Sequence, residues 1–157
     1  MTLKYFILCA FLFAACKSKR ELLETYPDGS IKKVRDYTGP NTWYEREYYV
    51  SGDIKIEKVF KSGLQDSIET VYDENGNRRG QAYFRNGLRN GLIRELYSSG
   101  QILFEGNCVD GKFEGLSTWY YRNGRIESQV HRHLGKDTGS MVRYDSVGNL
   151  LGADSDK

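Results

Sequence analysis

Three series of glycine residues constrain the fold of this chain more than any other feature. The first recurs at a step of 24 residues, after an initial step of 23: Gly29, Gly52, Gly76, Gly100, Gly124 and Gly148. The second follows each of the first five by 10 or 11 residues: Gly39, Gly63, Gly87, Gly111 and Gly135. The third comprises Gly91, Gly115 and Gly139. Self-similarity at a fixed period is the signature of a repeat architecture, so we predict a repeat protein.

The residues that precede these glycines indicate β-hairpins. Asn-Gly and Asp-Gly pairs adopt positive φ readily and favour tight hairpin turns. Such pairs stand at Asn75-Gly76, Asn86-Gly87, Asn123-Gly124, Asp28-Gly29 and Asp110-Gly111. The stretches between turns suit strands and lack a sustained helical period. We therefore predict an all-β fold, an elongated antiparallel β-meander of about five 24-residue hairpin repeats over residues 26–157.

The even repeat length predicts which side chains share a face of the sheet. Side chains alternate between faces, so we expect the even-numbered positions to form one mainly apolar face. They are Ile54, Ile56, Phe60, Ile68, Tyr72, Ala82, Phe84, Leu92, Leu96, Ile102, Phe104, Cys108, Leu116, Tyr120, Ile126, Val130, Val142 and Tyr144. A glycine inside a strand needs a reason. We expect Gly91, Gly115 and Gly139 each to face a Tyr or Trp of a neighbouring strand.

Tyrosines recur beside the turns of the first series: Tyr26, Tyr48, Tyr49, Tyr72, Tyr97, Tyr120, Tyr121 and Tyr144. Two interpretations remain open. The tyrosines could form a stabilising cross-strand ladder, or a stacking platform for a sugar or a peptide, because tyrosine also suits interfaces. The candidate binding residues under the second interpretation are Tyr72, Tyr97, Tyr121 and Trp119.

The N-terminal residues resemble a targeting signal. Residues 1–15 combine one lysine with an apolar run too short to span a membrane, which predicts a lipoprotein-type signal peptide. The run ends Phe13-Ala14-Ala15-Cys16, which resembles a lipobox, so Cys16 is the predicted lipidation site and the predicted location is a bacterial membrane, on the exported side. An uncleaved helical anchor is the alternative. The charged residues 16–25 are predicted to be a tether.

Composition and reactive residues exclude several functions. Loss of Cys9 and acylation of Cys16 would leave Cys108 alone, so we expect no intramolecular disulfide and a packing role for Cys108. The net charge of +2 and a single arginine cluster, which we interpret as a solvated sheet face, argue against nucleic-acid binding. His131 and His133 lack an evident third ligand, so we predict no metal site. No catalytic constellation stands out, and we expect neither enzymatic activity nor a cofactor.

The repeat unit resembles the MORN-variant repeats of bacteria, of the type named for the YwqK-type antitoxins. The resemblance covers nearly all of residues 26–150 and is fullest in the repeat that holds Tyr97, Gly100, Gly111, Gly115 and Tyr121. The first repeat departs at 41–43, and Ser67 replaces the third glycine of the second. The resemblance implies a protein-binding array, sometimes lipid-anchored, with no known catalytic residues.

These observations together predict a lipid-anchored, non-enzymatic protein that presents a β-sheet to a protein partner, with an antitoxin-like role implied by the resemblance. One alternative is a glycan- or cell-wall-binding module that uses the tyrosines. The other is a membrane-organising scaffold that self-associates through open strand edges.

Overall fold

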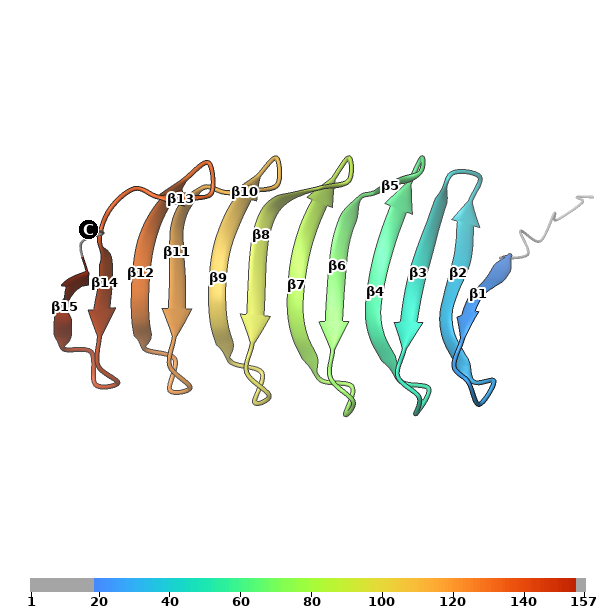
Figure 1. Cartoon of the computed structure of the whole chain (residues 1–157), viewed down its shortest axis with the longest axis horizontal. Coiled ribbons are helices and arrows are strands. Elements are labelled where there is room, and N and C mark those ends of the chain that lie inside the picture. Colours follow the sequence, from blue (N-terminus) through green and yellow to red (C-terminus); the bar gives the residue numbers. More distant parts are fainter. Residues whose placement is uncertain (1–18, 155–157) are drawn as a thin grey trace, which may run out of the picture.

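The computed structural model describes residues 19–154, which form one open antiparallel sheet (Figure 1). Its first strands are β1 (Arg20–Thr25), β2 (Ile31–Gly39), β3 (Thr42–Tyr48), β4 (Ile54–Lys61), β5 (Leu64–Gln65), β6 (Ser67–Tyr72), β7 (Arg78–Arg85) and β8 (Leu88–Leu96). The others are β9 (Ile102–Val109), β10 (Lys112–Phe113), β11 (Gly115–Tyr120), β12 (Ile126–His133), β13 (Lys136–Asp137), β14 (Met141–Tyr144) and β15 (Leu150–Asp154). The predicted signal peptide and Cys16 lie outside the described residues.

The strands follow one another in space in chain order, which confirms the predicted all-β meander. Three short strands, β5, β10 and β13, pair only at hairpin ends. Turns alternate between the two long edges of the sheet, which we call lower and upper as drawn in Figure 1. The lower turns span residues 26–30, 49–53, 73–77, 97–101, 121–125 and 145–149. Four upper turns lie at residues 61–64, 85–88, 109–112 and 133–136, where both central residues have positive φ, as in type I′ hairpins.

Strand β1 corrects the predicted tether, because residues 20–25 belong to the sheet. Arg20 lies opposite Asp36 and Leu22 opposite Val34, which is only 1% exposed. The pairing register shifts after Leu22 and again after Glu24. These irregularities disrupt the alternation of side chains between the two faces of the sheet, which is the sequence pattern expected of a strand. The sheet therefore includes residues 20–25, ahead of Tyr26, where we predicted the repeat array to begin.

The two faces of the sheet differ from the even–odd prediction. Ala82, Ile93 and Phe104 are buried on one face, the Phe104 face, whereas Leu92 lies opposite Asn107 on the other, which we call the Arg94 face. A two-residue hairpin pairs residues of opposite parity, as Arg85 pairs with Leu88. The prediction is therefore right for β4, β7, β9 and β12, which follow lower turns. It is wrong for strands that follow an upper turn, where the residues placed on the Arg94 face include Ile68, Leu92, Leu116 and Val142.

The glycines of the third series stand at their positions for different reasons. A Cβ on Gly91 would lie 3.2 Å from the Cβ of Tyr83, which confirms the expected aromatic neighbour. No atom lies within 4 Å of such a Cβ at Gly115 or Gly139, so the prediction is wrong there. Gly115 has φ +81°, and Ser67, which stands at the equivalent position two repeats earlier, has φ +70°. Positive φ is thus common to residues 67, 91 and 115, whereas Gly139 has neither a positive φ nor a close neighbour.

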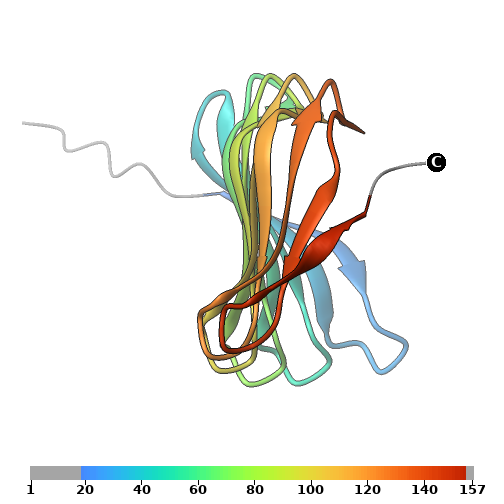
Figure 2. The same ribbon diagram turned by 90° about the vertical axis from the view of Figure 1, so that its left-hand side faces the viewer.

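The sheet twists along its length and is one layer thick in the described residues (Figure 2). Its buried hydrophobic cluster lies on β7, β8 and β9, in the middle of the sheet, and comprises Ala82, Ile93, Phe104 and Cys108. Among residues 19–154 we find no helix long and apolar enough to cross a membrane.

Candidate functional site

Four tyrosines tie the lower turns together. Each stands first in its turn, and its hydroxyl donates to the backbone carbonyl of the residue before the next lower turn. The pairs are Tyr26 to Tyr48 at 2.7 Å, Tyr49 to Tyr72 at 2.9 Å, Tyr97 to Tyr120 at 2.7 Å and Tyr121 to Tyr144 at 2.8 Å. Each bond joins one repeat to its neighbour, so we call these residues the tyrosine clasps.

The series of clasps is interrupted once inside the sheet. Asp73 stands first in its turn where the other interior turns have tyrosine. Arg79 takes over the role, because its Nε donates to the carbonyl of Leu96 at 3.1 Å and its Nη1 lies 3.6 Å from a carboxylate oxygen of Asp73. The side chain of Arg79, held near Asp73, thus replaces the tyrosine hydroxyl as the hydrogen-bond donor at this position.

These contacts support the stabilising-ladder interpretation for three of the candidate binding residues. Tyr97 and Tyr121 are half-buried and use their hydroxyls in the clasps, and Tyr72 supplies an acceptor carbonyl. The guanidinium of Arg122 also lies 4.7 Å from the ring centroid of Tyr97. Binding of a ligand by these tyrosines stays a prediction.

Trp119, the fourth candidate, belongs to the apolar half of the Phe104 face. Its ring centroid lies 4.9 Å from that of Phe104, and the guanidinium of Arg132 lies 5.3 Å from it. Cys108 is 1% exposed in the adjoining cluster, and burial raises the pKa of its thiol. The predicted packing role of Cys108 is confirmed.

A groove of about 300 Å³ opens beside Trp119 at the C-terminal end of the sheet. Trp119, Tyr121, Tyr144, Met141 and Leu151 give it an apolar and aromatic lining. Glu127, Ser128 and Arg143 add one acidic, one hydroxyl and one basic group. We call this the aromatic groove. It brings together two of the predicted residues, Trp119 and Tyr121, and leaves out Tyr72 and Tyr97.

The groove exists because one large side chain is missing from a row. Across the Phe104 face, Phe104 lies opposite Trp119, Trp119 opposite Ser128, and Ser128 opposite Arg143. Ser128 occupies the repeat position that Phe104 fills one period earlier. A phenyl group packs against Trp119 on one side, and on the other the small serine leaves the groove open. A comparison of repeat positions could have revealed this in the sequence.

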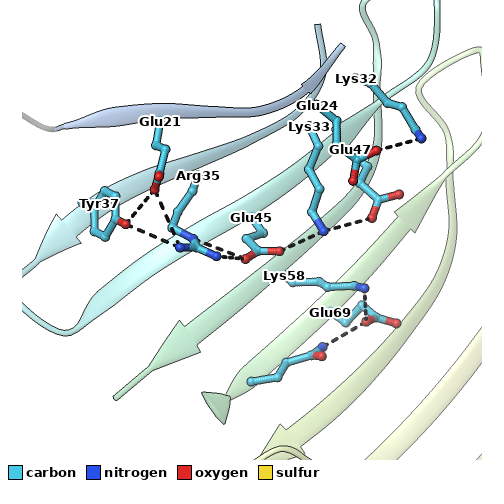
Figure 3. Close-up of polar contacts among 11 residues, drawn as sticks. Glu21, Glu24, Lys32, Lys33, Arg35, Tyr37, Glu45, Glu47, Lys58 and Glu69 are labelled. Carbon is cyan, nitrogen blue, oxygen red and sulfur yellow. Dashed lines mark hydrogen bonds and ion pairs between the residues drawn. The ribbon is translucent and has the colours of Figure 1, made fainter. Parts of the chain in front are cut away.

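Charged side chains replace the apolar cluster in the N-terminal half of the same face (Figure 3). Glu45, only 8% exposed, accepts from Arg35 at 2.7 Å and lies 3.1 Å from Lys33. Arg35 lies 3.7 Å from Glu21, and Lys33 lies 3.7 Å from Glu47. Because each cation contacts two carboxylates, the network stabilises the sheet where apolar side chains are few.

The two histidines lie on adjacent positions of the Arg94 face. The Nδ1 atom of His133 lies 2.8 Å from Glu114, whose other carboxylate oxygen accepts the backbone N–H of Leu134. These bonds lower the pKa of Glu114, chiefly through the Leu134 N–H. Within residues 19–154 no group of three or more His, Cys, Asp or Glu side chains could hold a metal ion.

Comparison with known families identifies the repeat. The family model of the MORN repeat variant matches residues 65–86 and 113–133. The second segment begins two repeat steps after the first, and each includes a lower turn with both flanking strands. The chain therefore carries MORN-variant repeats. No curated protein matches the chain.

Proposed function

We propose that this chain is a lipid-anchored, non-enzymatic repeat protein that binds a protein partner in the aromatic groove. The observation that carries the proposal is the convergence of Trp119, Tyr121 and Tyr144 on one open groove, together with Met141 and Leu151. Tryptophan and tyrosine dominate the energetic centres of protein interfaces because they bury a large rigid surface and keep a polar tip.

The position of the groove supports the same proposal. The groove lies at the β15 end of the sheet, whereas the chain enters at β1 (Figure 1). Twelve successive strands at about 4.8 Å place it about 50 Å from β1. An anchor on Cys16 would leave this end free to meet a partner. An antitoxin-like role, in which the partner is a toxin, is the more specific form of the proposal and is favoured by the family resemblance.

Two neighbouring leucines give a matched test of the groove. Leu151 lines it and is 66% exposed, whereas Leu150 does not line it and is 65% exposed. Tagged full-length proteins are crosslinked in native membranes, purified and analysed by mass spectrometry. We expect one stoichiometric protein partner with the wild type and with Leu150→Glu, and its loss with Leu151→Glu. Equal recovery with both variants contradicts the proposal, and so does recovery of wall glycan or of self-crosslinks alone.

The anchor has a separate test. Cys16→Ser should move the protein from the membrane fraction to the soluble fraction, with an unchanged circular dichroism spectrum. Full membrane retention of the folded variant would remove the lipid anchor from the proposal and leave the groove untouched.

A further inference from the structure

The upper turns carry a repeated pair of side chains. At the end of each of four hairpins, a cation lies directly opposite a second residue: Lys61 opposite Leu64, Arg85 opposite Leu88, Lys112 opposite Val109 and Lys136 opposite His133. Directly opposed residues point to the same face of a sheet. Alternation along the strands places all four pairs on the Arg94 face. In the last hairpin, Leu134 follows His133 and supplies the apolar group.

The apolar members form an exposed stripe along this edge. Leu64 and Leu88 are each 50% exposed, Val109 is 46% and Leu134 is 58%. A Cβ on Gly87 would lie 3.7 Å from Cδ2 of Leu64, so the leucine reaches the next upper turn. Leu88 reaches the turn at residues 109–112 in the same way. We call Leu64, Leu88, Val109 and Leu134 the upper stripe. Exposed apolar side chains that gather in one line mark an interaction surface.

The cations beside the stripe have no partners in the part of the chain that the structure describes. Lys61, Arg85, Lys112 and Lys136 make no ion pair or side-chain hydrogen bond among residues 19–154. Four acidic residues lie near these turns: Asp66, Asp110, Glu114 and Asp137. Glu114 is bonded to His133 and Asp137 to Arg132, and Asp110 accepts from Asn90. The stripe therefore offers unpaired positive charge beside apolar surface, which complements an acidic, amphipathic partner.

The spacing of the stripe matches an α-helix. Leu64 and Leu88 lie two strands apart, about 9.6 Å, and seven residues of α-helix rise about 10.5 Å. Val109 lies on the strand next to that of Leu88, about 4.8 Å away, and three residues of α-helix rise about 4.5 Å. The central residues of three of the turns include a polar residue (Ser62, Asn86 and Asp110), so Leu64, Leu88 and Val109 lie on the flank of the edge. A rod-shaped segment lying along the flank meets these three side chains, whereas a bilayer that meets the turns end-on contacts the polar residues first.

We propose that the upper stripe binds an acidic amphipathic α-helix of a partner protein. Two apolar residues of the helix, seven apart, contact Leu64 and Leu88, and a third, three residues further on, contacts Val109. The carboxylates of the helix pair with the neighbouring cations. This surface is separate from the aromatic groove, and the inference stands without it.

The test uses the full-length chain with Cys16→Ser, so that no lipid contributes. The probe is a fluorescent helical peptide of about 21 residues, with leucine at heptad spacing on one face and glutamate beside it. A matched peptide has lysine for every glutamate. We expect the glutamate peptide to bind in fluorescence anisotropy, and Arg85→Glu with Lys112→Glu to weaken it about tenfold or more, because two attractions become repulsions. Leu64→Gln with Leu88→Gln should weaken it as well.

The control variant carries Val50→Gln and Arg78→Glu at the lower edge. Val50 is 60% exposed and Arg78 is exposed, so the change in charge and polarity is of the same kind. It should bind the glutamate peptide as the wild type does, and circular dichroism should show every variant folded. Equal affinity for the two peptides, or unchanged binding by the upper variants, overturns the proposal. Capture of phosphatidylglycerol vesicles by the wild type without peptide binding overturns it in favour of a lipid surface.

Discussion

The hydroxyl of Tyr97 donates to the backbone carbonyl of Tyr120 at 2.7 Å, and so joins two repeats at the lower edge. Tyr97→Phe removes the donor and leaves a part-buried carbonyl without it, so we expect a loss of about 1 kcal/mol in the free energy of unfolding. Urea unfolding followed by circular dichroism measures this. Tyr83→Phe is the control, because Tyr83 is 44% exposed and its hydroxyl makes no hydrogen bond within residues 19–154. Equal stability of the two variants would contradict the clasp.

Ser67 holds φ +70°, a conformation that costs an L-residue about 1 kcal/mol or more and glycine little. Ser67→Gly should therefore raise the unfolding midpoint in urea. Ser98→Gly, at an exposed turn residue without positive φ, should lower it slightly because glycine gains more freedom on unfolding. A Ser67→Gly variant less stable than the wild type would show that the side chain outweighs the backbone conformation.

The ion-pair network should make the protein sensitive to acid. Burial raises the pKa of Glu45, but hydrogen bonds from Arg35 and Lys33 outweigh it and hold that pKa below its usual range. A carboxylate with a lowered pKa stabilises the fold fully above its unfolded value of about 4.3, and that contribution is lost as the pH falls through the folded value. We expect urea stability to decline below about pH 5, and Glu45→Gln to be less stable at neutral pH with a shallower decline.

Glu74→Gln is the matched control for this pH series. Glu74 is exposed in a lower turn and makes no ion pair in the described residues. Its profile should run parallel to that of the wild type. If the wild type and Glu45→Gln lose stability in parallel between neutral and acid pH, the Glu45 network does not contribute to acid sensitivity.

Cys108 should resist thiol reagents in the folded protein. Burial both blocks access and raises the pKa of the thiol, so little thiolate forms at mildly alkaline pH. Iodoacetamide labelling at Cys108, read by peptide mass spectrometry, should be slow without denaturant and fast in urea. Rapid labelling of the native protein would contradict the prediction and would show that the Cys108 thiol is accessible to solvent.

The turns could be predicted from the sequence because their chemistry is local. Both residues of Asn86-Gly87 and of Asp110-Gly111 have positive φ, as their chemistry favours, and the repeat step then predicts the other turns. Strand β1 could not be predicted in this way, since Arg20 and Leu22 acquire their role only from Asp36 and Val34 on the neighbouring strand.

The face of the sheet on which each side chain lies, and the position of the aromatic groove, depend on the pairing register of the strands. The glycine series does not determine that register. The buried residue of β8 is Ile93 and not Leu92, because the two-residue upper turn inverts parity. The aromatic groove depends on the same register, since the pairing of Trp119 with Ser128 places the small side chain beside the tryptophan. Sequence reasoning identified Trp119 and Tyr121 as aromatic candidates but could not place them in one groove.

The meander has a mechanical consequence. Tension between the two ends of the described chain acts across the strands, so it breaks the hydrogen bonds of one strand pair at a time. Such a sheet unfolds in small steps at low force, because the strand pairs separate one after another. It does not show a single rupture at high force. The turn where Asp73 and Arg79 replace a tyrosine clasp also lies near the change from charged to apolar packing. Stretching would divide the array there into two blocks of different chemistry.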